Sequence, residues 1–403
     1  MEYKIIASIK KTPQGKQAEE ILSKCVHCGM CNATCPTYQL LGDELDGPRG
    51  RIYQIKQVLE GATPTRTMQL HLDRCLTCLS CETTCPSGVK YGKLAEIGKQ
   101  LIDDSLQRPL HEKLFRKILR IILPYPNRLG PLVRMGQICR PVLPAFLKNK
   151  IPEFQNKLRW PETKHTRTML VLNGCAQPVM SPNINMATAN VLDKLGISLL
   201  SISNSGCCGA VSQHLGAEHE AKKFMRANID AWWPYIENGA EAIVITASGC
   251  GTVLKDYGQL LADDPDYSQK ASIIATLSQD ISEILSTEDM SRLHTPNEKP
   301  TLAFQSPCSL QHSQQLSGVV EKILTDFGYR LTTVKDAHLC CGSAGTYSLL
   351  QSNISNQLKV NKLKTLEEEQ PELIATANIG CLHHLQSGTD IPVQHWIEII
   401  DRM

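Results

Sequence analysis

Several features that would place this chain of 403 residues in familiar classes are missing from it. It has no apolar run of 18 residues that could span a membrane, and its start, MEYKIIASIKK, lacks the apolar stretch of a secretory signal. The formal net charge of +2 gives no reason to expect nucleic acid as a partner. No GxGxxG motif opens a helix after a strand, so there is no sign of a flavin site. We therefore expect a globular cytoplasmic protein that carries no flavin of its own.

Cysteine, by contrast, is abundant, with 17 residues. The pattern CxxCxxCxxxCP occurs twice, at 25–36 and at 75–86. Four thiolates are the usual ligands of a [4Fe–4S] cluster, and in this two-cluster spacing the fourth cysteine ligates the other cluster. The spacing therefore predicts two ligand sets: Cys25, Cys28, Cys31 and Cys85 for cluster 1, and Cys75, Cys78, Cys81 and Cys35 for cluster 2.

Structural zinc and disulfides are the alternatives for these eight cysteines. Zinc sites normally carry two CxxC pairs rather than a triplet followed by CP. An odd number of cysteines in metal-type groups, without an export signal, indicates a reducing compartment and argues against disulfides. Electron transfer is thus the expected role of the first quarter of the chain.

A second cysteine pattern is duplicated further along the chain. A single cysteine is followed 32 residues later by a CCG triplet and then by a fourth cysteine, and this order occurs twice. Such self-similarity indicates a repeated structural unit. The two sets are the first CCG quartet, Cys175, Cys207, Cys208 and Cys250, and the second CCG quartet, Cys308, Cys340, Cys341 and Cys381.

Short apolar segments that end in small-residue loops carry these cysteines. They predict strands within 168–175, 197–208, 241–250, 301–308, 329–341 and 372–381, with helical patterns such as 187–195 and 318–328 between them. This alternation predicts parallel sheets, whose ligands bind beyond the carboxyl ends of the strands. Each quartet would converge there on a further cluster or a zinc ion, or would merely pack in the core, as we expect for the lone Cys139.

The expected fold class is α+β multidomain: an α-helical dicluster ferredoxin domain followed by two duplicated α/β cysteine-rich units with parallel sheets. The expected domains are the two-cluster domain at 1–105, a basic proline-rich linker at 106–167, and CCG units at 168–290 and 291–403. Between residues 108 and 167 there are 14 Lys or Arg against three Glu. Within this stretch HEKLFRKILRIIL (111–123) predicts a basic amphipathic helix, which either packs on a neighbouring domain or docks on an anionic membrane or a partner.

The motifs carry a family resemblance. The amino-terminal part resembles the two-cluster ferredoxin domain of respiratory dehydrogenase subunits, and the repeat resembles the cysteine-rich domains of heterodisulfide reductase. The third subunit of anaerobic glycerol-3-phosphate dehydrogenase, a lactate-utilisation protein and the glycolate oxidase iron–sulfur subunits share this combination, and the last family fits best. The stretches that carry this likeness are 25–61, 73–88, 227–243, 246–251, 338–347 and 376–381.

The chain departs from the fullest CCG pattern, which ends in CxxC, because Ala247 and Asn378 stand at the earlier cysteine position. Three histidines near the second CCG quartet are either extra ligands or ordinary polar contacts: His312, His383 and His384. Arg49 and Arg51 fall in the segment between the two motifs, where we expect exposed loop arginines, the alternative being contact with a cluster or a partner subunit.

The resemblance implies a complex that oxidises glycolate to glyoxylate, with FAD held by partner subunits. This chain would have no catalytic residue and would pass single electrons through two [4Fe–4S] clusters towards a membrane quinone. It would then lie peripherally on the cytoplasmic face of the inner membrane. The alternatives are an iron–sulfur subunit of a D-lactate or glycerol-3-phosphate dehydrogenase, a CCG-type disulfide or quinone reductase, and a zinc-stabilised scaffold in the CCG half.

Overall fold

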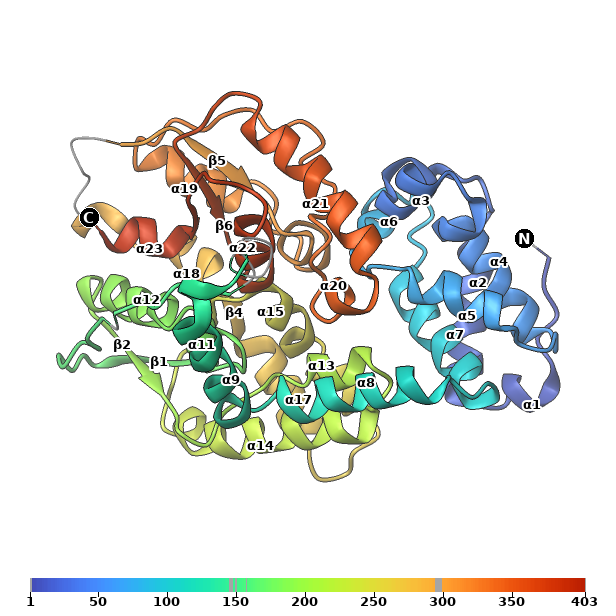
Figure 1. Cartoon of the computed structure of the whole chain (residues 1–403). Coiled ribbons are helices and arrows are strands. Elements are labelled where there is room, and N and C mark those ends of the chain that lie inside the picture. Colours follow the sequence, from blue (N-terminus) through green and yellow to red (C-terminus); the bar gives the residue numbers. More distant parts are fainter. Residues whose placement is uncertain (1, 145–147, 149–150, 157, 294–298, 403) are drawn as a thin grey trace. The chain divides into compact units, whose positions relative to one another are not determined.

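The computed structural model describes residues 2–144, 148, 151–156, 158–293 and 299–402, and it divides into two compact units (Figure 1). The first unit comprises Met1–Phe115 and His338–Leu358, and the second comprises Arg116–Ala337 and Lys359–Met403. A few residues of the predicted basic linker (145–147, 149–150 and 157) and of the predicted second CCG unit (294–298) lie outside the described part.

The first unit is built from helices. Its α-helices are α1 (Ala7–Lys10), α2 (Pro13–Lys24), α3 (Pro36–Leu41), α4 (Pro48–Leu59), α5 (Arg66–Asp73), α6 (Ser80–Thr83), α7 (Tyr91–Ser105) and α20 (Tyr347–Leu350). Two 3₁₀ helices, η1 (Met30–Thr34) and η2 (Glu44–Asp46), complete it. Helices α8 (Leu110–Ile122) and α21 (Ser352–Glu367) each run across the division between the units.

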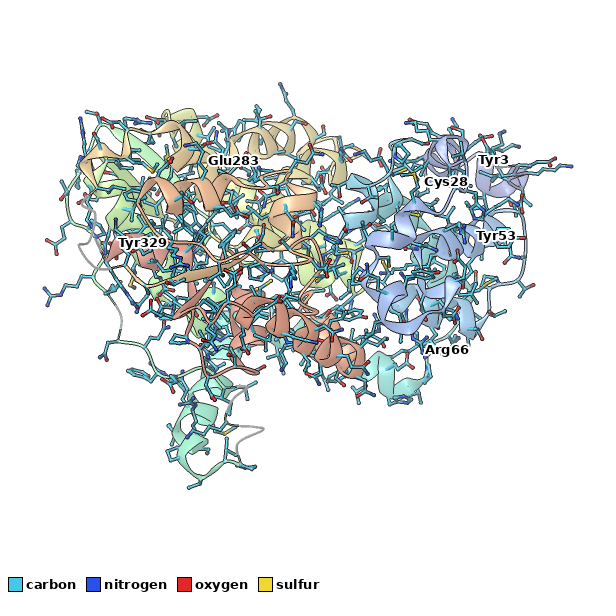
Figure 2. All side chains as sticks on the ribbon, turned by 90° about the horizontal axis from the view of Figure 1, so that it is seen from above. Tyr3, Cys28, Tyr53, Arg66, Glu283 and Tyr329 are labelled. Atoms are coloured by element: carbon cyan, nitrogen blue, oxygen red, sulfur yellow. The ribbon has the colours of Figure 1, made fainter. Side chains whose placement is uncertain are left out.

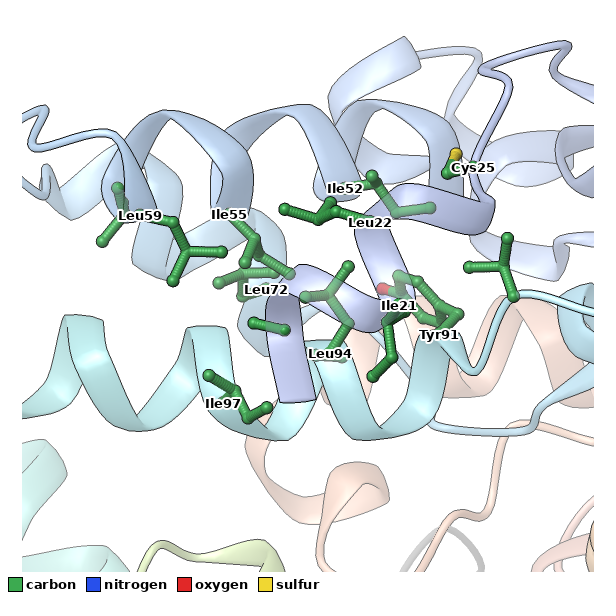
Figure 3. Close-up of a cluster of buried hydrophobic side chains, with 14 of the residues drawn as sticks. Ile21, Leu22, Cys25, Ile52, Ile55, Leu59, Leu72, Tyr91, Leu94 and Ile97 are labelled. Atoms are coloured by element: carbon green, nitrogen blue, oxygen red, sulfur yellow. The ribbon is translucent and has the colours of Figure 1, made fainter. Parts of the chain in front are cut away.

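The core of the first unit lies between α2, α4, α5 and α7, where aliphatic side chains interleave (Figure 3). Leu22, Ile55 and Leu94 are fully buried there. Helices α4 and α7 approach closely because Gly98 has no side chain: a Cβ at this position would lie 2.5 Å from Cγ1 of Ile55. This packing fixes the helices from which the cysteine loops depart.

Both cysteine motifs begin where a capped helix ends. Thr12 caps the start of α2 by accepting from the N–H of Gly15, and Thr65 caps α5 in the same way. At the far ends, Cys25 donates its N–H to Leu22 O and Cys75 donates to Leu72 O, each at 3.1 Å. The two motifs therefore leave the helical core in the same manner.

The second unit contains two parallel sheets. The first has the order β2-β1-β3-β4 and the second the order β5-β6-β7. Their strands are β1 (Arg167–Val171), β2 (Ile197–Ser201), β3 (Ile243–Ile245), β4 (Ser278–Asp280), β5 (Leu302–Gln305), β6 (Leu373–Thr376) and β7 (Val393–His395). The register pairs Leu170 with Ile243 in the first sheet and Ala303 with Ile374 in the second.

Helices alternate with these strands, as a parallel sheet requires. In the first half they are α9 (Pro126–Cys139), η3 (Arg140–Val142), α11 (Gln177–Met180), α12 (Asn183–Lys194), α13 (Ala210–His214), α14 (Glu218–Glu237), α15 (Ser248–Lys255), α16 (Tyr257–Leu260), α17 (Ser268–Leu277) and α18 (Ile281–Thr287). In the second half they are η4 (Met290–Arg292), the π-helical η5 (Ser309–Ser313), α19 (Val319–Asp326), α22 (Ile379–Gln386) and α23 (Trp396–Asp401). Trp232 of α14 and Tyr257 of α16 are the largest side chains of the first sheet's core.

The predicted fold class is confirmed, and so are most of its elements. Strands occur in five of the six predicted segments, and helices α8, α12 and α19 lie where the sequence patterns place helices. The segment 329–341 is the exception: it is described in full and contributes a single bridge, between Leu331 and Leu302, instead of a strand. The predictions also missed β4 and β7, because their sequences, SQD and VQH, are largely polar and form no apolar run. Among the described residues, no helix has the length and the apolar character that a membrane span requires.

Candidate iron–sulfur centres

The first predicted cysteine set lines one cavity of the first unit. This cavity, of about 450 Å³ and open to solvent, is bordered by Cys25, Cys28, Cys31 and Cys85. Burial and the neighbouring thiolates raise the pKa of Cys31 to about 11. Cys28 is exposed (Figure 2), whereas Cys25 is buried.

The second predicted set lines a neighbouring cavity of about 300 Å³, bordered by Cys35, Cys75, Cys78 and Cys81. The structure thus places Cys85 with the first motif and Cys35 with the second, which is the exchange that the spacing predicts. Cys81 also borders the first cavity, so the two cavities adjoin. Ligation itself remains a prediction for all eight cysteines.

Left-handed backbone curls each loop around its cavity. In the first loop His27 has φ 61° and Gly29 has φ 84°; in the second loop Thr77 has φ 51° and Leu79 has φ 61°. These positions follow Cys25 and Cys75 by the same two and four residues. Positive φ at a non-glycine residue costs of order 1–3 kcal/mol and persists where the surroundings impose it, often at functional sites.

Hydrogen-bond donors point at the sulfurs of the second cavity. The Thr77 N–H lies 3.4 Å from Cys75 Sγ and the Tyr91 hydroxyl lies 3.5 Å from the same atom. On the other side, Thr37 Oγ1 lies 3.3 Å from Cys35 Sγ, but its hydroxyl donates to Asp46 O at 2.8 Å. Four thiols around a cavity, with donors directed at sulfur, fit a [4Fe–4S] cluster.

The spread of the thiols argues against zinc. Four sulfurs bound to one tetrahedral zinc lie about 3.8 Å apart, given a Zn–S bond of about 2.3 Å. Across the part of the chain that the structure describes, the group of three ligand-type atoms within 4.8 Å of one another is Asp43, Asp46 and His71, and it includes no sulfur. Asp46 there is occupied by an ion pair with Arg74 at 2.8 Å and a contact with His71 at 2.9 Å.

Arg51 is buried, so the expectation that it is an exposed loop arginine is wrong. It lies on helix α4 rather than in a loop, and only 1% of its side chain is exposed. Its Nε donates to His71 O at 2.8 Å, and its Nη atoms donate to Thr37 Oγ1 at 3.2 Å. Burial would raise the pKa of Cys75, but Arg51 and other lowering influences leave that pKa below its usual value. Arg49, also on α4, is 35% exposed and pairs with Glu44.

The first CCG quartet converges in the second unit. Cys175 follows β1, Cys207 and Cys208 follow β2, and Cys250 lies in α15 just after β3, so all four lie beyond the carboxyl ends of parallel strands. The thiols form a connected chain, in which Cys207 contacts Cys175 and Cys208, and Cys208 contacts Cys250. Hydrogen bonds from Cys207 and Cys250 lower the pKa of Cys208, so its thiolate is the favoured anion of the set.

Two residues that the sequence reasoning missed hold the Cys207–Cys208 loop. Asn228 accepts from the Gly206 N–H and donates to Cys207 O, both at 2.8 Å. The Tyr257 hydroxyl donates to Cys208 O at 2.9 Å. Asn228 falls in the 227–243 stretch that carries the family resemblance, and that was the available signal; Tyr257 had none.

The cysteines of the second CCG quartet belong to different units, because Cys308 and Cys381 are in the second and Cys340 and Cys341 in the first. Its convergence stays a prediction. The local turn is nevertheless repeated: Gly209 N–H lies 3.4 Å from Cys207 Sγ, and Gly342 N–H lies 3.4 Å from Cys340 Sγ. Asn378 and Ala247 stand where the fullest CCG pattern has a further cysteine. Asn378 donates towards Cys381 Sγ at 3.5 Å, and Ala247 is buried.

Among the three histidines, His383 makes a polar contact with Ser181 Oγ at 3.0 Å. Burial lowers its pKa to about 4, so the imidazole is neutral at physiological pH. His384 shares helix α22 with it, and His312 lies in η5. Cys139 is exposed at the end of α9, which contradicts the expectation that it packs in a core.

Comparison with known proteins agrees with this arrangement. The model of the 4Fe-4S dicluster domain matches residues 21–89, and that of the cysteine-rich CCG domain matches residues 169–255 and 302–386. The glycolate oxidase iron-sulfur subunit of Escherichia coli K12 is 51% identical over 403 residues, which cover 100% of this chain and 99% of that protein. The chain belongs to the glycolate oxidase iron–sulfur subunit family. The resemblance stated from the motifs is therefore confirmed.

Two further relatives are less similar and match less of this chain. The probable glycolate oxidase iron-sulfur subunit of Bacillus subtilis 168 is 30% identical, with 92% of this chain and 89% of that protein covered. Lactate utilization protein A of the same organism is 28% identical over 241 residues, which cover 56% of this chain and 96% of that protein. The glycolate oxidase iron–sulfur subunits thus match this chain over far more of its length than the lactate protein does.

Proposed function

We propose that this chain is the electron-transfer subunit of a complex that oxidises glycolate with FAD bound to partner subunits. The observation that carries the proposal is the pairing of two adjoining four-cysteine cavities with a likeness to a glycolate oxidase subunit over the whole chain. A flavin accepts two electrons, whereas a [4Fe–4S] cluster carries one at a time. Such a chain would accept the two electrons singly and deliver them to a membrane quinone.

The residues of this chain would hold and insulate the carriers rather than perform acid–base chemistry. Cys25, Cys28, Cys31 and Cys85 would hold cluster 1, and Cys75, Cys78, Cys81 and Cys35 would hold cluster 2. When bound, these clusters supply reversible one-electron reduction. Buried Ile52 and Val89 line the first cavity, and Thr77 and Tyr91 direct donors at sulfur in the second.

The first CCG quartet would hold a further metal group. Its four thiols converge beyond the strands, and the Asn228 and Tyr257 hydrogen bonds fix the loop that carries two of them. An additional iron–sulfur cluster at this site would extend the electron route. Zinc there would make the CCG half a scaffold for the partner subunits.

Affinity purification of this chain from its native host tests the proposal. We expect flavoproteins to co-purify, glycolate to be oxidised by the assembly, and iron with acid-labile sulfide to exceed the eight irons of two clusters. Purification without any flavoprotein, or an assembly that oxidises D-lactate or glycerol 3-phosphate but not glycolate, would contradict it. Zinc in place of the extra iron would overturn only the assignment of a cluster to the CCG quartet.

Helix α8 is the surface that we propose for docking on an anionic membrane. Leu114, Phe115, Ile118 and Ile121 are between 40% and 59% exposed and recur at the spacing of one helical face. Lys113 and Lys117 are exposed on the same helix. An apolar face flanked by lysines suits a helix that lies in the headgroup region.

Vesicle flotation checks the role of α8. We expect the chain to float with vesicles that contain phosphatidylglycerol, and the pair of changes Leu114→Glu and Ile118→Glu to weaken partitioning about tenfold or more, because two apolar side chains no longer enter the membrane. The matched control is Ile273→Glu, which changes an exposed residue of α17. Equal partitioning of all three proteins would refute membrane docking by α8.

A further inference from the structure

Two arginines, two residues apart on helix α4, serve different cavities. Arg49 borders the cavity of Cys25, Cys28, Cys31 and Cys85, and Arg51 borders the cavity of Cys35, Cys75, Cys78 and Cys81. The first contact depends on a glycine, since a Cβ at Gly29 would lie 2.4 Å from Arg49 Nη1. Helix α4 therefore places one guanidinium group beside each of the two cavities that we expect to hold a cluster.

The two guanidinium groups differ in burial and in charge balance. Arg49 is 35% exposed, and Glu44 Oε1 lies 2.6 Å from its Nε, so water and a dedicated carboxylate weaken its field. Arg51 is 1% exposed, and its acidic neighbour Asp46 lies 3.5 Å away. Asp46 makes its shorter contacts with Arg74 at 2.8 Å and His71 at 2.9 Å. Two arginines thus share one carboxylate beside the second cavity.

A buried positive charge matters for a redox group because reduction adds one negative charge. Coulomb attraction grows as the effective dielectric constant falls, so Arg51 stabilises added charge more than the solvated, paired Arg49 does. Hydrogen bonds to sulfur act in the same direction. Backbone N–H groups supply one at each cavity, from His27 to Cys25 and from Thr77 to Cys75, and the Tyr91 hydroxyl adds another to Cys75 Sγ. Both effects favour reduction of a cluster in the second cavity.

We propose that Arg51 makes cluster 2 the more readily reduced of the two clusters, so that electrons move from cluster 1 to cluster 2. This inference rests on the proposed function, in which the eight cysteines hold the clusters. In the step, cluster 1 loses one electron and cluster 2 gains it; no bond forms or breaks, and no proton moves. Arg51 acts as a positioning residue through its fixed charge.

The surroundings of the two cavities fit this direction. Beside the first cavity, Val26 is 66% exposed, Met30 is 53% exposed and Cys28 is exposed, so a donor protein can approach cluster 1. Near the second cavity, the Tyr347 hydroxyl donates to Arg74 O at 3.0 Å. Burial raises the pKa of Tyr347, and Cys75 and Cys340 contribute to the same shift. Within the first unit, the segment His338–Leu358, which carries Cys340 and Cys341, thus contacts the residue that precedes Cys75.

An EPR-monitored redox titration of the full chain, purified without oxygen, tests the proposal. Cys28→Ser and Cys78→Ser assign the two signals, because each changes a ligand of one cluster. In the otherwise unchanged protein we expect the cluster altered by Cys78→Ser to be reduced first. We expect Arg51→Gln to lower its reduction equilibrium constant at least tenfold, equivalent to about 59 mV for one electron.

The matched variants separate charge from packing. Arg51→Lys keeps the charge and should restore most of the lost potential, while Arg49→Gln should shift cluster 1 less than Arg51→Gln shifts cluster 2. If the Arg51→Gln variant does not bind cluster 2, the order in which the two clusters are reduced in the unchanged protein still tests the proposal. Earlier reduction of cluster 1, or an unshifted cluster 2 in Arg51→Gln, would overturn the proposal. Failure to find two [4Fe–4S] signals would instead overturn the proposed function.

Discussion

Cys35 lies in the first cysteine motif but borders the cavity of the second. The sequence could predict this placement because the CxxCxxCxxxCP spacing leaves the fourth cysteine outside the loop of its own motif. The burial of Arg51 could not be predicted in the same way. Its partners Thr37, Asp46 and His71 come from three separate segments, and an arginine without visible partners is expected to be exposed.

Replacement of Cys35 by Ser should perturb cluster 2 and leave cluster 1 intact, because the thiolate borders the cavity of Cys75, Cys78 and Cys81. EPR spectra of the reduced protein measure this. The control Cys139→Ser changes an exposed cysteine at the end of α9 and should alter neither signal. A change confined to the cluster of Cys25, Cys28 and Cys31 would show that the exchange of fourth ligands is wrong.

The two CCG turns share a backbone conformation that requires glycine. Gly209 has φ 94° and Gly342 has φ 90°, a conformation that favours glycine. In each turn the glycine N–H points at the first sulfur of the CCG triplet. The strands were predictable because five short apolar runs end at these loops. Strands β4 and β7 were not, because their sequences, SQD and VQH, contain no apolar run.

Replacement of Gly209 by Ala should destabilise the first CCG unit by about 1–3 kcal/mol, because it adds a Cβ at positive φ. The new Cβ would also lie 3.1 Å from Ala221 O. Urea unfolding midpoints measure the effect. Gly206→Ala is the matched control, since a Cβ there meets nothing within 4 Å and its φ is ordinary. Equal midpoints for the two variants would refute the role assigned to this turn.

Across the whole molecule, the division into two compact units was not predictable from local pattern. The segment His338–Leu358 groups with the first unit although the repeat assigns it to the second CCG unit. Contacts such as Tyr347 to Arg74 join residues more than 270 positions apart, and spacing carries no information about them. The four predicted domains, 1–105, 106–167, 168–290 and 291–403, remain a prediction.

His395 joins the two halves of the second unit and makes its stability depend on pH. The ring contacts Thr246 O at 2.8 Å through Nε2, and Nδ1 accepts from the Ile397 N–H at the start of α23. Burial lowers the pKa of His395 to about 4, below the ordinary value of 6.5. Between these values the unfolded chain binds a proton that the folded chain does not, so stability falls as the pH falls.

We expect His395→Asn to reduce this pH dependence, since asparagine can cap α23 but does not titrate. One such imidazole contributes at most about 1.4 kcal/mol per pH unit. Urea midpoints from pH 7 to pH 5.5 give the slope, and His383 should maintain part of it. An unchanged slope in His395→Asn would show that His395 does not titrate on unfolding.

We propose that electrons from glycolate reach the clusters of this chain. The most direct measurement adds glycolate, without oxygen, to the assembly purified from the native host and records the EPR spectrum. We expect reduced [4Fe–4S] signals that are absent when the chain is separated from its flavoprotein partners. Reduction of the flavin by glycolate with no change in the iron–sulfur signals would contradict it.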